Sequence, residues 1–157
     1  MILRPYEIVD APIFAETFND PVYRDYWRHC SVVLKQKDFE NIEQIMGLQV
    51  MVVEDEGKII GFLTGKPQTE TTIFTSILIL KDSQKSGYAR EMIELGLDYL
   101  KEHRFHKVAI RINPENKLLE TLCRSMGFIE EGYFKEERWS AEGWKDERIM
   151  ALFLENR

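Results

Sequence analysis

The feature that most restricts the fold of this chain is the order of its apolar patterns between residues 58 and 112. Two β-branched runs, "KIIGFLTG" and "TTIFTSILIL", are followed by a stretch to about residue 103 whose apolar residues form one helical stripe, and then by "KVAIRI". A strand, a helix and another strand in this order predict a parallel pair, because the helix must cross the sheet between them.

Sequences on both sides of this segment predict antiparallel hairpins. "LQVMVVE" and "KIIGFLTG" are separated by "DEGK", and "FIEEGYFKEERW" and "ERIMALFLE" are separated by the polar turn "SAEGWKD". Another strand in "MILRPYEI" is restricted to a sheet edge or an irregular stretch by Pro5, which lacks a backbone N–H. We therefore expect an α/β (α+β) fold with a mixed central sheet of about seven strands.

About four helices should flank this sheet. They are expected over residues 11 to 19, in "DFENIEQIM", from the segment after Gln84 to about His103, and in "NPENKLLETLCRSMGF". Gly127 lies at the end of the last of these segments and is expected to form a left-handed cap there. The i, i+3, i+4 spacing of Tyr23, Tyr26 and Trp27 also suggests a short helix with one aromatic face.

Composition restricts the class of protein further. With 157 residues, 44% of them hydrophobic and 31% charged, residues 1–157 are expected to form one globular domain. The absence of a long apolar run and of a signal-peptide pattern indicates a cytoplasmic protein without a membrane segment. A formal net charge of −6 disfavours nucleic-acid binding, and two widely separated cysteines favour free thiols over a zinc site.

One short segment carries a functional signal. "LKDSQKSGYAREM" leads from a strand into a helix. The start of that helix holds basic and small residues, and its first carboxylate is Glu91. Helix N-termini normally favour acidic side chains, so a bound anion is one interpretation. The alternative is an ordinary turn in which Ser86 caps the helix. Neither a Walker A sequence nor a G-x-G-x-x-G sequence is present.

A resemblance distinguishes between these interpretations. Gln84-Lys85-Ser86-Gly87-Tyr88-Ala89 resembles the Gln/Arg-x-x-Gly-x-Gly/Ala motif of the GNAT superfamily of acyl-CoA-dependent N-acetyltransferases. "NPENKLLETLCRSMGFIEEG" resembles the next helix of that family, with a Gly-Phe pair eleven residues after Asn116, and "GWKDERIMALF" resembles the last strand of the ribosomal-protein N-terminal and polyamine acetyltransferase branches. The likeness covers almost the whole chain.

The resemblance implies a site for the cosubstrate acetyl-CoA. The backbone of Ile77, Leu78 and Ile79 would pair with the pantetheine arm, and Asn116 would supply a polar contact. Lys117 and Arg124 could meet the nucleotide phosphates or simply be surface residues. The pyrophosphate would be held chiefly by the backbone amides of one loop, whose residues are Gln84, Lys85, Ser86, Gly87, Tyr88, Ala89 and Arg90.

The resemblance also suggests catalytic groups. The amide near Ile79 would stabilise the oxyanion of the tetrahedral intermediate. Many family members have a proton-donating tyrosine seven residues after the asparagine, where this chain has Cys123; a buried structural thiol is the alternative meaning of that cysteine. Tyr133 is the nearest substitute as a proton donor, and packing is its alternative role.

No general base is evident, because Glu54 and Glu70 are isolated strand or loop carboxylates. This favours an α-amine, with a pKa of about 7.7 to 8, or a similarly weakly basic amino sugar over a lysine-like amine with a pKa of about 10.4, unless protons pass through water. The leading hypothesis is transfer of an acetyl group from acetyl-CoA to a primary amine of a small molecule or peptide. The alternative is a non-catalytic acyl-CoA-binding module.

The remaining polar and aromatic candidates have weaker functional meaning. Tyr23, Tyr26 and Trp27 could line the acceptor site or belong to the core. The pairs Glu130-Glu131 and Glu136-Glu137 could attract a cationic acceptor or be solvated strand ends. His103 and His106 lie around a helix end, and no metal site is expected from the histidines. A homodimer is compatible with the sequence, but no residue pattern identifies its interface.

Overall fold

The computed structural model describes residues 1–21, 23, 34–84, 87–140 and 142–154. Within these ranges there are seven strands in the hydrogen-bonded order β1-β2-β3-β4-β5-β7-β6, together with four α-helices. The mixed α/β fold with about seven strands and about four helices is thereby confirmed. The described residues divide into two compact units, one from Met1–Lys66 and Ile77–Leu95 and the other from Pro67–Ser76 and Gly96–Arg157.

The first unit contains the N-terminal strands and helices. β1 (Ile2–Pro5) pairs antiparallel with β2 (Gln49–Asp55), which pairs antiparallel with β3 (Lys58–Pro67). β1 ends the strand order, as expected for a strand that contains Pro5. α1 (Ala11–Asn19) begins after Asp10 with a proline in its first turn, which is the predicted helix start.

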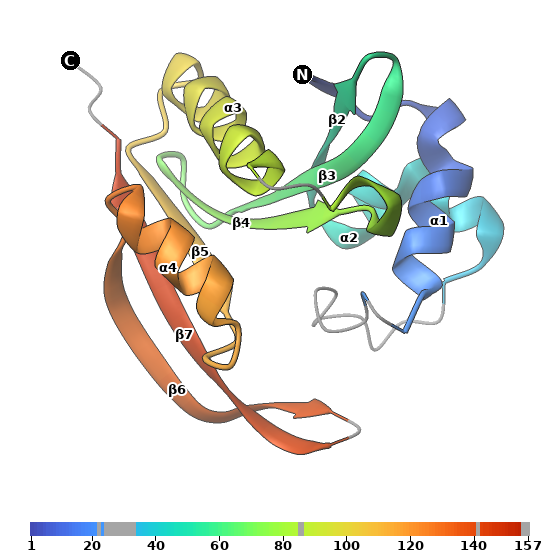
Figure 1. The fold of residues 1–157 in the computed structure, drawn as a ribbon. Helices are drawn as coiled ribbons and strands as arrows, with labels where there is room; N and C mark the ends of the chain where they lie inside the picture. The colour runs from blue at the N-terminus through green and yellow to red at the C-terminus, as the bar shows by residue number, and fades with distance from the viewer. Residues whose placement is uncertain (22, 24–33, 85–86, 141, 155–157) are drawn as a thin grey trace. The chain divides into compact units, whose positions relative to one another are not determined.

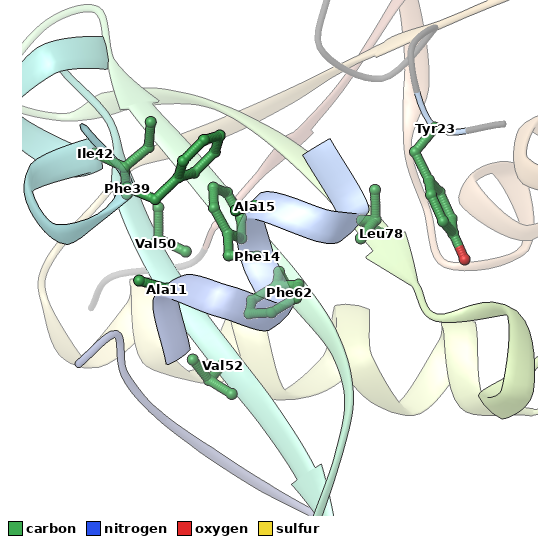
Figure 2. Packing of buried hydrophobic residues seen from close by; sticks show 10 residues of the cluster. All are labelled: Ala11, Phe14, Ala15, Tyr23, Phe39, Ile42, Val50, Val52, Phe62 and Leu78. Atoms are coloured by element: carbon green, nitrogen blue, oxygen red, sulfur yellow. The ribbon is translucent and has the colours of Figure 1, made fainter. Parts of the chain in front are cut away.

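One aromatic cluster forms the core of this unit (Figure 2). Phe14 of α1 is fully buried, and its ring makes edge contacts with Phe62 at a centroid distance of 4.9 Å and with Phe39 at 6.2 Å. Figure 2 shows the apolar side chains of α1 directed at the strands, where Val50 and Val52 point towards the helix. Burial of these large aromatic side chains stabilises the packing of α1 on the strands.

The second unit contains a long hairpin and the helix beside it (Figure 1). β5 (Lys107–Ile112) pairs parallel with the first half of β4 (Thr72–Ile79), as predicted, and antiparallel with β7 (Gly143–Phe153). β6 (Ile129–Ser140) pairs antiparallel with β7, and α4 (Lys117–Ser125) lies alongside the hairpin. Gly127, with φ +92°, adopts the left-handed conformation expected after α4.

Two boundaries differ from the sequence-based expectations. The expected helix over "DFENIEQIM" is a 3-10 helix, η3 (Gln36–Asn41), followed by the short α2 (Ile42–Met46), which ends at Gly47 in a left-handed conformation. The polar turn expected over "SAEGWKD" is much shorter, because β6 extends to Ser140 and β7 already begins at Gly143. Tyr26 and Trp27 lie outside the described residues, so the short aromatic helix remains a prediction.

Candidate functional site

The end of β4 is the first element of the candidate site. The parallel register with β5 runs from Thr72, opposite Lys107, to Thr75, opposite Ile110, and β4 continues beyond it to Ile79. Ile77 and Leu78 are buried in this continuation, and Ile79 is partly buried. Leu80 N–H then donates to the carbonyl of Ile60 at 2.9 Å, which ties the chain to β3 where the strand ends.

The loop after β4 leads directly into a helix. A single 3-10 turn, η4 (Lys81–Ser83), is followed by the exposed Gln84, and α3 (Tyr88–Glu102) begins four residues later. Lys85 and Ser86 lie outside the described residues, so the possible capping role of Ser86 remains a prediction. The amide of Glu91 donates to the carbonyl of Gly87 at 3.1 Å, which closes the first helical turn.

Gly87 is the residue whose conformation makes this entry into α3 possible. Its φ is +92°, a region that side chains with a Cβ rarely adopt. Apart from its chain neighbours, the described residues place no heavy atom within 4 Å of the position that a Cβ would occupy. The amide groups of a first helical turn point along the helix axis towards its N-terminus, so this geometry suits an anion such as a phosphate.

Tyr88 connects the start of α3 to the β2–β3 hairpin. Its hydroxyl donates to Asp55 Oδ2 at 2.7 Å, and this hydrogen bond raises the pKa of Tyr88 above its usual value. The other oxygen of Asp55 lies 3.1 Å from the amino group of Met1. The remaining residues of the predicted loop are less constrained: Ala89 is partly buried, and the exposed Arg90 lies 3.8 Å from Glu94 within the helix.

A second contact holds the beginning of the loop. Lys81 Nζ donates to Asp20 Oδ2 at 2.7 Å, which raises the pKa of the lysine, and it lies 5.9 Å from the centre of the Tyr23 ring. Tyr23 itself is buried with the core cluster, although Figure 2 shows it at the periphery of the labelled side chains. The burial of Tyr23 favours its interpretation as a core residue.

Asn116 and Cys123 lie on α4 in the second unit. The side-chain oxygen of Asn116 accepts a hydrogen bond from Leu119 N–H at 3.1 Å, so the residue caps α4. Cys123 is fully buried, and this burial raises the pKa of its thiol to about 11. A buried thiol with a raised pKa favours the structural interpretation of Cys123.

Tyr133 lies on β6 and is about 43% exposed. Its hydroxyl donates to Asp146 Oδ2 at 2.7 Å, and this hydrogen bond raises the pKa of Tyr133. Asp146 also accepts from the amide of Glu136 at 2.9 Å. The proton of Tyr133 is therefore directed at a carboxylate of the neighbouring strand, within the segment that the sequence pattern assigned to a turn.

Several charged candidates have ion-pair partners. Glu54 lies 2.6 Å from Arg4, and Glu70 is exposed. Lys117 and Arg124 lie 3.4 Å and 3.2 Å from Glu120. The acidic pair 130–131 is held by Arg148 and Lys107, at 2.8 Å and 2.6 Å respectively. These contacts favour the surface interpretation of the charged residues on α4 and β6.

Neither a membrane helix nor a metal cluster is found in the part of the chain that the structure describes. Its longest helix is α3, and no helix there is long and apolar enough to span a bilayer. The same residues contain no group of three or more histidine, cysteine, aspartate and glutamate side chains arranged to hold a metal ion.

Asp55 and Lys81 are contacts that sequence reasoning missed. Asp55 ends β2 beside the "DEGK" turn, where a carboxylate normally indicates a solvated hairpin. Lys81 begins the 3-10 turn two residues after the end of β4, and a basic residue there could have been grouped with the basic residues of the loop. Their partners Tyr88 and Asp20 are 33 and 61 positions away in sequence, so no local pattern reveals either pair.

Comparison with protein families gives one match that covers most of the chain. The family model described as "Acetyltransferase (GNAT) family" matches residues 19–128. Among curated proteins, spermidine N(1)-acetyltransferase of Vibrio cholerae serotype O1 is 31% identical over 77 residues. That alignment covers 48% of this chain and 44% of the relative, so the chain spans less than half the length of the curated relative.

Solved structures share the fold over nearly the full length. Spermidine N-acetyltransferase from Vibrio cholerae, in complex with CoA and spermine, superposes with a TM-score of 0.87 at 24% identity, covering 98% of this chain and 95% of that chain. Ribosomal-protein-alanine N-acetyltransferase from Brucella melitensis gives a TM-score of 0.82 at 20% identity, covering 98% and 100%. The protein yncA of Salmonella typhimurium, solved with acetyl-CoA, gives 0.78 at 19% identity, covering 100% and 95%.

Proposed function

Because the chain belongs to the acetyltransferase (GNAT) family, we propose that it transfers the acetyl group of acetyl-CoA to a primary amine of a small molecule or peptide. The observation that carries this proposal is the loop at Gly87, which leads from the end of β4 into α3. A helix start of this kind suits the pyrophosphate of coenzyme A.

The proposed reaction is direct attack of the amine on the thioester. The nitrogen lone pair forms a bond to the carbonyl carbon, the carbon–sulfur bond breaks, the coenzyme A thiolate leaves, and the amine loses a proton. The backbone of Ile77 to Ile79 would bind the pantetheine arm, and the amide near Ile79 would stabilise the oxyanion. The pyrophosphate would lie against the loop from Gln84 to Arg90, and the contact of Asn116 with the cosubstrate stays a prediction from the resemblance.

The proton donor and acceptor candidates all have contacts that restrict such a role. Cys123 is a poor proton donor in the observed environment, because it is fully buried. Tyr133 is accessible, although its proton is directed at Asp146. Glu54 is paired with Arg4. These contacts support an amine with an appreciable neutral fraction near pH 7, such as an α-amine or a weakly basic amino sugar, or proton transfer through water.

The second candidate function is an acyl-CoA-binding module without turnover. Cys123 supports it, since this buried thiol occupies the position at which many members of the family have a proton-donating tyrosine. Both functions require the same cosubstrate site, so binding must be measured before activity.

The binding test is calorimetric titration of the protein with acetyl-CoA, desulfo-CoA and ADP. Gly87→Glu should abolish binding of both CoA compounds, because it places a carboxylate in the loop and strains the backbone there. Gly143→Glu is the matched control, since Gly143 also has a positive φ, of +106°, and no described heavy atom beyond its chain neighbours within 4 Å of its Cβ position. Equal losses in the two variants, or a wild-type protein that binds no CoA compound, would contradict the proposed site.

The turnover test separates enzyme from binder. Release of the free thiol of coenzyme A is followed with acetyl-CoA and a panel of peptide α-amines, polyamines, amino sugars and amine antibiotics. Turnover with at least one amine supports the transferase. Tight binding of acetyl-CoA without turnover across the panel supports the binding module.

A further inference from the structure

The hydrogen bond between Tyr88 and Asp55 lies where the proposed cosubstrate loop meets α3. Tyr88 is the first residue of α3 and directly follows Gly87, whose backbone can adopt many conformations. The tyrosine hydroxyl donates a hydrogen bond to Asp55, the last residue of β2, at 2.7 Å.

A loop that contains a glycine loses conformational freedom when it binds a ligand, and a contact that orders it beforehand reduces this loss. The apolar side chains of α3, including the fully buried Met92, hold the helix from the second turn onwards. The hydrogen bond from Tyr88 to Asp55 holds the first residue of the helix, which is next to the amides proposed to bind the pyrophosphate.

We propose that Asp55 is a positioning residue that fixes the first turn of α3, where coenzyme A is proposed to bind, through its hydrogen bond to Tyr88. This inference rests on the proposed function, because it assumes that coenzyme A binds at the loop. It assigns to the β2–β3 hairpin a role in cosubstrate affinity, although the hairpin itself makes no proposed contact with acetyl-CoA.

The charge of Asp55 allows a sharp test. Coulomb's law predicts that removal of a carboxylate near an anionic ligand strengthens binding. Loss of the hydrogen bond to Tyr88 should weaken it. A charge effect and a positioning effect therefore change the dissociation constant in opposite directions.

The first variant is Tyr88→Phe, which removes the hydroxyl and keeps both the Asp55 charge and its contact with the Met1 amine. The dissociation constant of desulfo-CoA, measured by calorimetry, should rise about three- to tenfold, the range of a single hydrogen bond. Asp55→Ala should also raise the dissociation constant, but by less than Tyr88→Phe because it removes a charge near the anion as well, and the double variant should be no worse than the more affected single variant.

Glu56→Gln is the matched control, because it removes a neighbouring charge of the same hairpin that acts on Tyr88 only through space. Its dissociation constant should be unchanged or lower. In turnover measurements, Asp55→Ala should raise the KM for acetyl-CoA and leave kcat within about twofold, a separation that general destabilisation does not produce.

The outcomes distinguish the two levels of the proposal. If the wild-type protein binds no CoA compound, the proposed function fails. If the wild type binds desulfo-CoA but Tyr88→Phe and Asp55→Ala bind it as tightly or more tightly, the proposed function stands and Asp55 has no positioning role. Additive losses in the double variant would also overturn the inference.

Discussion

Gly61 lets the backbone of β4 and the side chain of Met92 approach β3 closely. A Cβ at this position would clash with the carbonyl oxygen of Leu78 and would lie 2.8 Å from Met92 Cε. The contact with the Leu78 carbonyl is the more costly of the two, because the backbone of β4 would have to move, whereas the Met92 side chain can change its rotamer. The close approach therefore helps to fix the end of β4, which is the proposed pantetheine strand.

Gly61→Ala should lower the free energy of unfolding by about 1–3 kcal/mol, the usual cost of overpacking. Gly132→Ala is the matched control, since the nearest atom to its Cβ position is Ile149 Cβ at 3.9 Å. Its free energy of unfolding should change by less than about 0.5 kcal/mol. Urea denaturation measures both, and equal effects would show that the approach of β4 to Gly61 is not restrictive.

Cys123 should make stability fall at alkaline pH. Its thiol has a pKa of about 11 in the folded chain and about 8.5 when unfolded. The folded state therefore holds the proton more tightly than the unfolded state. The contribution of the protonated thiol to the free energy of unfolding is complete below about pH 8.5 and is lost as the pH rises towards 11. The difference in unfolding free energy between wild type and Cys123→Ala, measured from pH 7 to 10.5, should shrink over that interval.

The activity of the same variant tests the alternative role. A structural thiol predicts that kcat of Cys123→Ala stays within about threefold of wild type once the protein is folded. A loss of about a hundredfold or more, the range typical of a lost acid or base, would identify Cys123 as the proton donor.

At the scale of elements, an ion-pair cluster joins β1 and β2 to the residue preceding α1. Arg4 donates to both oxygens of Asp10, each at 2.8 Å, and to Glu54 at 2.7 Å. Asp10 is almost fully buried, and the hydrogen bonds from Arg4 are the main reason that its pKa lies below the usual carboxyl value. The cluster ties an edge strand of only four residues to the rest of its unit.

Arg4→Met should cost about 2–4 kcal/mol of unfolding free energy at pH 7, because it leaves the buried Asp10 charge without its main partner. Lys107→Met is the control, since Lys107 and Glu131 form a more exposed pair at 2.6 Å, and its cost should be below about 1 kcal/mol.

The same comparison depends on pH. Since the pKa of Asp10 is depressed, the difference in unfolding free energy between wild type and Arg4→Met should disappear as the pH falls below about 4. Urea denaturation from pH 7 to pH 3 checks this, and equal costs in the two variants at pH 7 would contradict it.

Most elements could be predicted because their signals are local. Alternation marked the strands, Asp10 and Pro12 marked the start of α1, and Gly127 marked the end of α4. The first boundary error has a tertiary cause and the second a cause within one hairpin. Residues 36–41 adopt a 3-10 helix around the buried Phe39, and the end of the β6–β7 hairpin is extended by the cross-strand pair of Trp139 and Trp144, whose ring centroids are 5.2 Å apart.

At the scale of the whole molecule, the two units share secondary-structure elements. The boundary between them falls within β4, between Ser76 and Ile77, and within α3, between Leu95 and Gly96. That residues 1–157 form one domain stays a prediction.

Thermal and urea unfolding should therefore show one transition. Far-ultraviolet circular dichroism reports on all helices, whereas tryptophan fluorescence is dominated by the β6–β7 hairpin, which carries two of the three tryptophans. The two probes should give the same midpoint. Separate midpoints would show that the units unfold independently and would contradict the single-domain prediction.

The sequence by itself determined the order of elements, the parallel pair formed by β4 and β5, and the position of the glycine loop at the start of α3. These depend on periodicity and on the conformational freedom of glycine, which are properties of neighbouring residues. Only the tertiary structure decided that Cys123 is buried, that Tyr133 donates to Asp146, and that Tyr88 is held by Asp55. These contacts join residues on different elements, and folding brings such residues together without leaving a local pattern in the chain.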